Sequence, residues 1–583
     1  MAIFESKTQP APLAVEAEIS QQKLPRRMLV WISLGLIVAL GAFLRFYELG
    51  TYSIGNAYYA ATVKSMLTSW HNFFYAAFEP GGSVSVDKPP LGFWIQAASA
   101  AIFGFNGFAL AFPQALAGVI SIPLLYALVK RPFGQISGLV AALVLAVMPV
   151  TIATERNNTI DGLLVLVLLL AAWAFLRAVR TERLRDLLLG AVLIGAGFNI
   201  KMLQAYMILP ALYLVYLLGS RLCWWKRFAY LGAATAVMLV VSLSWAVIVD
   251  LTPASSRPYV GSSTNNTEME LIVGHNGVER LTGMAHSNDD GNRGGLAANS
   301  NMQPPSLQGN QAPQGMLPRQ PGGAGGPPDG GGNNGNPGRV GSPPGGGNGG
   351  QRADEVGTAG VFRLFTAPLA DEASWLLPLA ILGGLAGLVV LGWRWPLTER
   401  HLAILLWGGW LGLTSGYFSF TTGLFHTYYL IMLGPAIAAL VGVAFWAMQK
   451  VFRSRSDLGW PLVAGLTGVC LAFEIFVLRA QTSLAAAIPL VAGIAWLVGI
   501  VFLVFHRREG PRRAAWALIV VSLLVGPMVW SGLTTFNTNP EVNLPHAGPT
   551  TGGGQVAQDA STLTADEQAI LDILLENAGT QKY

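Results

Sequence analysis

The chain has 583 residues, of which 52% are hydrophobic and only 11% are charged, and its mean hydropathy is +0.48. Soluble domains average about 25% charged residues, so this composition excludes a soluble globular protein and predicts an all-α polytopic membrane protein. The net charge of +5 arises in short loops rather than in a separate basic domain, which argues against nucleic-acid binding.

About thirteen apolar stretches predict membrane-spanning helices, since one span needs roughly 20 apolar residues. They lie at 28–48, 107–129, 135–153, 161–178, 186–200, 203–219, 228–249, 373–393, 402–417, 427–448, 459–478, 484–505 and 514–533. The stretch 89–105 is also apolar, but counting it as a span would reverse every later crossing. We therefore predict that it forms a helix lying at, or dipping into, the outer interface.

Seven clusters of basic residues separate these stretches and all fall on one side of the predicted membrane. They are Lys23/Arg26/Arg27, Lys130/Arg131, Arg177 through Arg185, Arg221/Lys226/Arg227, Arg394/Arg400, Lys450/Arg453/Arg455 and Arg507/Arg508/Arg512/Arg513. Basic loops face the cytoplasm in membrane proteins. The pattern therefore predicts a multi-pass protein of the cell membrane with a cytoplasmic N-terminus and an extracytoplasmic C-terminus.

The crossings divide the chain into two membrane modules and several extramembrane segments. The expected parts are a cytoplasmic tail 1–27, a module 28–250 with a first outer loop 49–106, an outer loop 251–372, a module 373–533 and an outer tail 534–583. Within the second outer loop, residues 284–357 are rich in Gly, Pro and Asn and bury too little apolar surface to fold. The tail is expected to be the start of a truncated soluble domain.

Polar residues able to do chemistry gather on the outer side. Asp87 and Lys88 stand side by side before two prolines that start a helix, which suits either a reactive site or an interface anchor. Asp161 and Lys201 lie at the outer mouths of spans. Ionisable groups at membrane depth are costly and usually face a cavity or one another, so a structural Lys201–Asp161 ion pair is the alternative for these two.

Four cations converge on this outer mouth: Arg45, Lys88, Arg156 and Lys201. Cations beside apolar helices suit the phosphate of a lipid-linked donor, and Asp87 or Asp161 could deprotonate an acceptor hydroxyl. Arg45 violates the positive-inside bias and therefore needs an anionic partner. No Walker loop or GxGxxG motif follows a strand, so a nucleotide donor is not expected.

Aromatic residues at the same mouth are candidates to line a substrate site, although an aromatic belt at the interface is the alternative. These are Tyr58, Tyr59, His426 and Tyr428. His275 and His286 could join Asp87 at a metal, but no ligand spacing supports that site.

Over roughly residues 28–450 the chain resembles a bacterial member of glycosyltransferase family 39, which has the GT-C fold. The resemblance rests on Tyr58-Tyr59-Ala60, Asp87-Lys88-Pro89-Pro90-Leu91, Arg156 with Asp161, Lys201, Lys64 to Phe74 and Gly274 to Gly283. It implies a GT-C bundle with extracytoplasmic juxtamembrane helices. The implied reaction is the inverting transfer of a sugar from a polyprenyl phosphate to a lipid, glycan or protein acceptor. In the family the residue at Lys88 contacts the donor phosphate, and some members hold a divalent metal with the acid at Asp87.

Two departures from the family concern the reaction itself. Well-studied members begin the first outer helix with an Asp-Glu pair whose aspartate is taken as the base, whereas this chain has Gly55 and Asn56. The family arginine near the second span is replaced by the run Ala111 to Gln114. Asp87 and Asp161 are the best replacements for the base, with Glu48 behind them. A lipid transporter or flippase, and a non-catalytic membrane partner that keeps the fold, are the rival hypotheses.

Overall fold

The computed structural model describes residues 26–278, 356–423, 425–479, 487–506, 509–538 and 544–549. The predicted cytoplasmic tail up to residue 25, nearly all of the Gly-rich insert, His286 and the tail beyond residue 549 lie outside the described residues. Within the described ranges the regular structure is helical, and the only extended pairings are two isolated bridges. This confirms the predicted all-α class.

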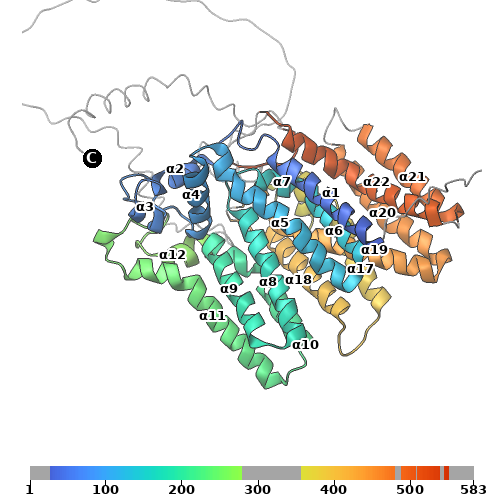
Figure 1. Cartoon of the computed structure of the whole chain (residues 1–583), viewed down its shortest axis with the longest axis horizontal. Helices are drawn as coiled ribbons and strands as arrows, with labels where there is room; N and C mark the ends of the chain where they lie inside the picture. The colour runs from blue at the N-terminus through green and yellow to red at the C-terminus, as the bar shows by residue number, and fades with distance from the viewer. Residues whose placement is uncertain are drawn as a thin grey trace, which may run out of the picture.

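The long helices pack side by side into one bundle, with short helices gathered at one end (Figure 1). The bundle contains α1 (Arg26–Phe46), α5 (Gly107–Phe133), α6 (Gln135–Ala146), α8 (Asp161–Thr181), α9 (Leu184–Lys201), α10 (Leu209–Gly219), α11 (Trp224–Leu251), α17 (Leu377–Leu391), α18 (Glu399–Phe420), α19 (Gly434–Ser454), α20 (Ser456–Leu478), α21 (Ala487–Phe505) and α22 (Glu509–Thr535). The shorter elements are α2 (Ala57–Met66), α3 (Trp70–Tyr75), α4 (Leu91–Phe103), α7 (Pro149–Glu155), η1 (Met202–Ile208), η2 (Ala254–Ser256), α12 (Glu268–Val273), η3 (Gly274–Val278), η4 (Arg363–Phe365), α16 (Ala370–Ala373) and η5 (Thr427–Leu433).

A helix lies over each of the thirteen predicted spans, but the count of thirteen is not confirmed. Among the described residues, nine helices are long and apolar enough to cross a membrane, or ten if the bent pair α6 and α7 is one span. The stretch Leu184–Gly219 is counted as one helix. The chain nevertheless turns back within it, since a hydrogen bond from the Arg221 amide to the Glu182 side chain brings its two ends together. With 13 residues, α4 reaches only about 20 Å, as expected for a helix that does not span.

The centre of the bundle is α19. In Thr427–Ser454, which contains α19, 94% of the most apolar stretch is buried, whereas the value for α1 and α21 is 22%. A helix that is apolar on all sides is stable only when neighbours surround it, and α5, α6, α17, α18 and α20 pack against α19. Close approach requires small residues: a side chain at Gly442 would lie 2.6 Å from the Ser137 carbonyl oxygen.

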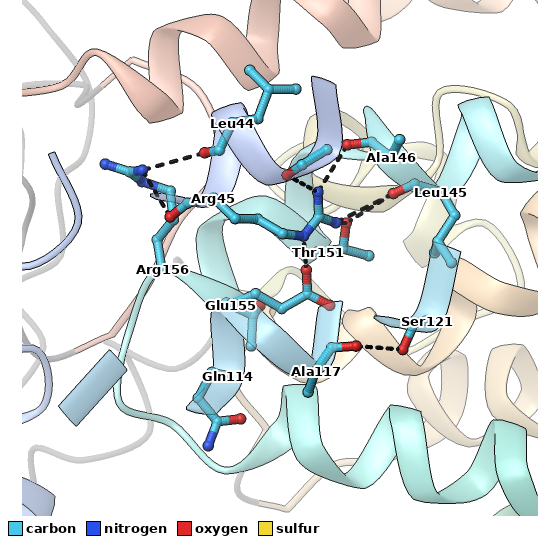
Figure 2. A network of polar contacts seen from close by, with 12 residues as sticks. Leu44, Arg45, Gln114, Ala117, Ser121, Leu145, Ala146, Thr151, Glu155 and Arg156 are labelled. Carbon is cyan, nitrogen blue, oxygen red and sulfur yellow. Dashed lines mark hydrogen bonds and ion pairs between the residues drawn. The ribbon is translucent and has the colours of Figure 1, made fainter. Parts of the chain in front are cut away.

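One buried ion pair ties α1 to the bend between α6 and α7 (Figure 2). The Arg45 guanidinium donates to Glu155 Oε2 at 2.5 Å, and its other donors reach Thr151 Oγ1 and the carbonyls of residues 41, 145 and 146. The two side chains are 0% and 2% exposed. Any side chain at Gly118 would collide with Glu155, because its Cβ would lie 2.1 Å from Oε2.

This pair answers the expectation that Arg45 needs an anion, but it corrects the role assigned to Arg45. The guanidinium has five N–H donors, and protein acceptors engage it through Nε, Nη1 and Nη2. Because every donor of the Arg45 guanidinium already has a protein acceptor, none is left for a donor phosphate. The sequence did not single out Glu155 as the partner.

Arg156 is likewise a structural residue in this fold. Its Nη1 donates to the carbonyls of Leu44, Arg45 and Tyr47 at the end of α1, and its Nη2 donates to the Thr535 carbonyl at the end of α22. Cations commonly satisfy the last carbonyls of helices in this way. The donor-phosphate role predicted for Arg156 therefore lacks geometric support.

Glu155→Ala is expected to destabilise the protein strongly because it leaves the Arg45 cation buried without its counter-ion. Breaking a buried pair typically costs about 3–5 kcal/mol. The Glu399→Ala variant is the matched control, since Glu399 pairs with Arg131 at 3.6 Å while both side chains are more than half exposed, and exposed pairs contribute about 0–1 kcal/mol. Thermal unfolding in detergent should show a large loss of Tm for the first variant and little for the second. Equal losses would contradict the structural role of the pair.

Candidate active site

Asp87 and Lys88 lie on a segment that backbone hydrogen bonds to two other parts of the chain hold in place. The Val86 amide donates to the Ala76 carbonyl at 3.0 Å, and the Ser85 amide donates to the Tyr259 carbonyl at 2.8 Å. Two prolines follow, and α4 begins at Leu91. Because proline fixes its own φ, Asp87 and Lys88 have a defined direction relative to α4.

The Lys88 ammonium contacts the Asp87 carboxylate and also the Asp87 carbonyl at 3.1 Å. Lys88 is 3% exposed. A buried ammonium requires anionic or carbonyl acceptors, and the neighbouring acid supplies both. This geometry excludes the reading of the motif as a solvated interface anchor.

Asp161 and Lys201 form the second acid–base pair of the site. Asp161 is the first residue of α8, and Lys201 is the last residue of α9. Lys201 Nζ lies 2.5 Å from Asp161 Oδ1, with the side chains 5% and 1% exposed. The structural ion pair that the sequence offered as an alternative is therefore present.

Lys88 and Lys201, from two different ion pairs, line the same cavity of about 330 Å³. Its other lining residues are Leu203, Gln204, Tyr206, Met207, Asn276, Gly277, Tyr417 and Tyr429. The Gln204 amide nitrogen and Asp161 Oδ2 are buried, and neither has a hydrogen-bond partner among the described residues. Buried polar atoms without partners are uncommon, so this region has capacity left for a polar ligand.

Aromatic rings from η5 form one wall beside Lys201. The Lys201 ammonium lies 3.9 Å from the ring centre of Tyr429 and 5.2 Å from that of Tyr428, which is cation–π geometry. His426 stacks on Tyr428 with 5.8 Å between ring centres. Of these three, Tyr429 lines the cavity, although the sequence prediction had chosen Tyr428 and His426.

Tyr58 and Tyr59 reach the site from α2 by different routes. The Asp87 amide donates to the Tyr58 hydroxyl at 3.3 Å, and burial, followed by the Asp87 charge, raises the pKa of Tyr58 well above its usual value. Tyr58 is therefore a neutral phenol beside the acid. Tyr59 is buried and packs edge-on against Phe93, which gives it a packing role.

The second outer loop adds two residues to the site: His275, which the sequence offered only as a possible metal ligand with Asp87, and Asn276, which it did not select. His275 Nε2 lies 3.5 Å from Asp87 Oδ2. The Asn276 side chain donates to the Asp87 carbonyl at 3.2 Å and lines the cavity. For Asn276 the only sequence signal was the family-like stretch Gly274 to Gly283.

Asp87 and His275 are both metal-ligand types, and their side chains lie 3.5 Å apart. Within the described ranges, no group of three or more His, Cys, Asp and Glu side chains is placed to hold a metal ion. The proposed third ligand, His286, lies outside those ranges.

The structure explains why no acid stands at the start of α2. Gly55 has a positive φ of +76°, and a Cβ there would lie 2.4 Å from Asn158 Oδ1. That oxygen accepts from the Asn56 amide at 2.5 Å, and Asn158 donates back to the Asn56 carbonyl at 3.0 Å. Asn56 in turn caps α2 through the Tyr59 amide. An aspartate at residue 55 would require this network to be rebuilt.

The chain matches known proteins in both sequence and fold. Residues 87–245 match the family model described as dolichyl-phosphate-mannose-protein mannosyltransferase. YkcB of Bacillus subtilis is 39% identical over 94% of this chain and 81% of its own length. YycA of the same organism is 40% identical over 88% of this chain and 78% of its own length. The names of both relatives propose a mannosyltransferase activity.

Two more distant matches bear on the fold and the family. A polyprenol-phosphate-mannose–protein mannosyltransferase of Mycobacterium tuberculosis is 28% identical over 32% of this chain and 35% of its own length. The crystal structure of ArnT from Cupriavidus metallidurans bound to undecaprenyl phosphate superposes with a TM-score of 0.50 at 16% identity. That superposition covers 87% of this chain and 77% of ArnT, and it shows a shared fold. The chain therefore belongs to glycosyltransferase family 39 and is a membrane glycosyltransferase of the GT-C fold.

Proposed function

We propose that this glycosyltransferase takes its sugar from a polyprenyl phosphate and that the cavity between Lys88 and Lys201 binds the donor phosphate. The observation that carries the proposal is the placement of two buried ammonium groups on one cavity. Cations in a site closed to water bind phosphate far better than they do in bulk solvent. The titles of the related proteins, which name polyprenol-phosphate mannose and bound undecaprenyl phosphate, support this donor class and favour mannose as the sugar.

The reaction is a single displacement at the anomeric carbon. An acceptor hydroxyl oxygen forms the new bond to that carbon as the bond to the phosphate oxygen breaks. The electron pair leaves with the polyprenyl phosphate, and inversion follows from attack on the opposite face. The acceptor loses its proton to a carboxylate, and negative charge grows on the phosphate. Catalysis therefore needs a base at the acceptor oxygen and cations at the phosphate.

Asp87 is the proposed base, and the lysines are the proposed phosphate ligands. Asp87 is 17% exposed, whereas Asp161 is 1% exposed and bound to Lys201. A base must reach the acceptor proton, and the more accessible carboxylate meets that condition better. Asp161 is assigned the role of orienting Lys201 against Tyr429. His275, within 3.5 Å of Asp87, is placed to receive or share the proton.

We further propose that this site faces the outside of the cell and that the acceptor is an extracytoplasmic lipid, glycan or protein. The seven basic clusters support this orientation. The native Cys223 is exposed at the opposite end of the bundle, between α10 and α11, whereas Cys470 is buried.

Lys88→Ala should weaken use of the donor about tenfold or more, because a lost charge-assisted hydrogen bond costs about 1.5–3 kcal/mol. Lys88→Arg keeps the charge and should retain part of that affinity. The measurement is donor binding and sugar transfer in detergent with a synthetic polyprenyl-phosphate mannose. Parental behaviour of both variants would remove Lys88 from the phosphate site.

Asp87→Asn should lower turnover by at least about a hundredfold while donor binding survives, since a general base typically contributes 10²–10⁴-fold. Asp161→Asn should mainly weaken donor binding, because it frees Lys201 from its fixed position. Transfer rates and donor affinities measured separately distinguish the two. Normal turnover in Asp87→Asn would move the base to Asp161 or Glu48. No transfer by the parent protein with any donor would favour the non-catalytic rival.

Thiol labelling of intact cells tests the orientation. Ser256 lies exposed after α11 on the outer-loop side, so Ser256→Cys should react with an impermeant maleimide. Cys223 should react only after the membrane is permeabilised. The reverse pattern would place the catalytic cavity in the cytoplasm.

A further inference from the structure

A second cavity, of about 460 Å³, lies at the end of the bundle opposite the catalytic cavity. It is formed where α5 passes into α6 and where α19 ends, and it is lined by Phe133, Gly134, Gln135, Ile136, Ser137, Trp446, Gln449, Lys450, Arg453 and Ser454. The 21 residues of α19 span about 31 Å, and η5, with its catalytic-site tyrosines, leads directly into the start of α19. The two cavities are thus separated by roughly the thickness of a bilayer core.

The charge in this second cavity is entirely positive. Lys450 and Arg453 line it, and none of its lining residues is acidic. Neither cation forms an ion pair with a carboxylate in the part of the chain that the structure describes. A neighbouring cavity at the same end differs, because it contains Glu399 beside Arg131 and Arg180, and Glu399 pairs with Arg131. Of these two cavities at the same end, the neighbouring one has an internal counter-ion and the second cavity has no acidic lining residue.

Two further features of this cavity suit a phosphate group. The first turn of α6, residues 135–137, lines it, and this turn has neither a side-chain cap nor an acidic residue. Open amides at a helix start favour anions. The Lys450 ammonium also lies 5.3 Å from the ring centre of Trp446, whose other neighbours include Phe133. The indole thus holds the cation at the edge of the cavity.

We propose that this cavity is a binding site for the phosphate group of an anionic membrane lipid. Lys450, Arg453 and the start of α6 would hold the phosphate, while the exposed Ile136 offers an apolar surface to the acyl region. Inorganic phosphate shares the charged chemistry but gains nothing from the apolar side. Basic pockets between helices at the membrane surface suit lipid head groups for this reason. The proposal is independent of the reaction at the catalytic cavity.

The test is native mass spectrometry of the delipidated full-length protein titrated with phosphatidylglycerol. The parent should retain one lipid more tightly than it retains phosphatidylcholine. The double variant Lys450→Ala/Arg453→Ala should bind phosphatidylglycerol about 30-fold more weakly, since each basic residue near an anionic head group contributes about 1 kcal/mol. The charge-conserving pair Lys450→Arg/Arg453→Lys should retain most of the affinity.

The matched control is Arg221→Ala/Lys226→Ala, which removes the same charge at the same end of the bundle from exposed residues that do not line the cavity. It should bind the lipid like the parent. Equal losses in both double variants would overturn the site in favour of general surface charge. Equal retention of phosphatidylcholine by the parent would also overturn it. Displacement of the lipid by millimolar inorganic phosphate would reassign the cavity to a soluble phosphate.

Discussion

A charge buried in an apolar bundle must find its counter-charge inside the protein, and the Arg45–Glu155 pair meets this constraint at the point where α1, α6 and α7 converge. Solvation lost by a buried ion amounts to several kcal/mol, so the guanidinium recruits the carboxylate and carbonyls from two helices. Arg156, the next residue, then fastens the ends of α1 and α22. Asn158 and Asp161 follow this junction within a few residues in the chain, so the junction positions both.

The same constraint separates structural cations from functional ones. All donors of Arg45 have protein acceptors, whereas Lys88 and Lys201 each have one carboxylate partner and line one cavity. A lysine so held is desolvated and oriented before any ligand arrives. Preorganised cations cost no reorganisation when charge develops on a leaving phosphate. The carboxylates of Asp87 and Asp161 thus stabilise the two buried ammonium groups that we propose as ligands of the donor phosphate.

Sequence patterns could predict the helices and the motif residues but not their partners. Apolar runs of sufficient length identify spans because lipid requires internally satisfied backbones, and every predicted span contains a helix. The pairing of Arg45 with Glu155 joins residues 110 positions apart, and hydropathy carries no information about such a contact. The positions of Tyr417 and Gln204 at the cavity could not be predicted either, because tertiary packing rather than local sequence brings them there.

Glycine at residue 55 fits the position of Asn158, whose Oδ1 would lie 2.4 Å from a Cβ there. Asn158 bonds the Asn56 backbone in both directions, and its own carbonyl accepts from Gln96 of α4 at 2.6 Å. One asparagine therefore locks α2 to α4, the two outer helices on either side of the Asp87 segment. A side chain at residue 55 would break this lock, while the segment between the helices already presents an acid next to a phosphate-binding candidate. In this arrangement Asn158 takes the space that a side chain at residue 55 would need, and it fixes the outer helices that flank the Asp87 segment.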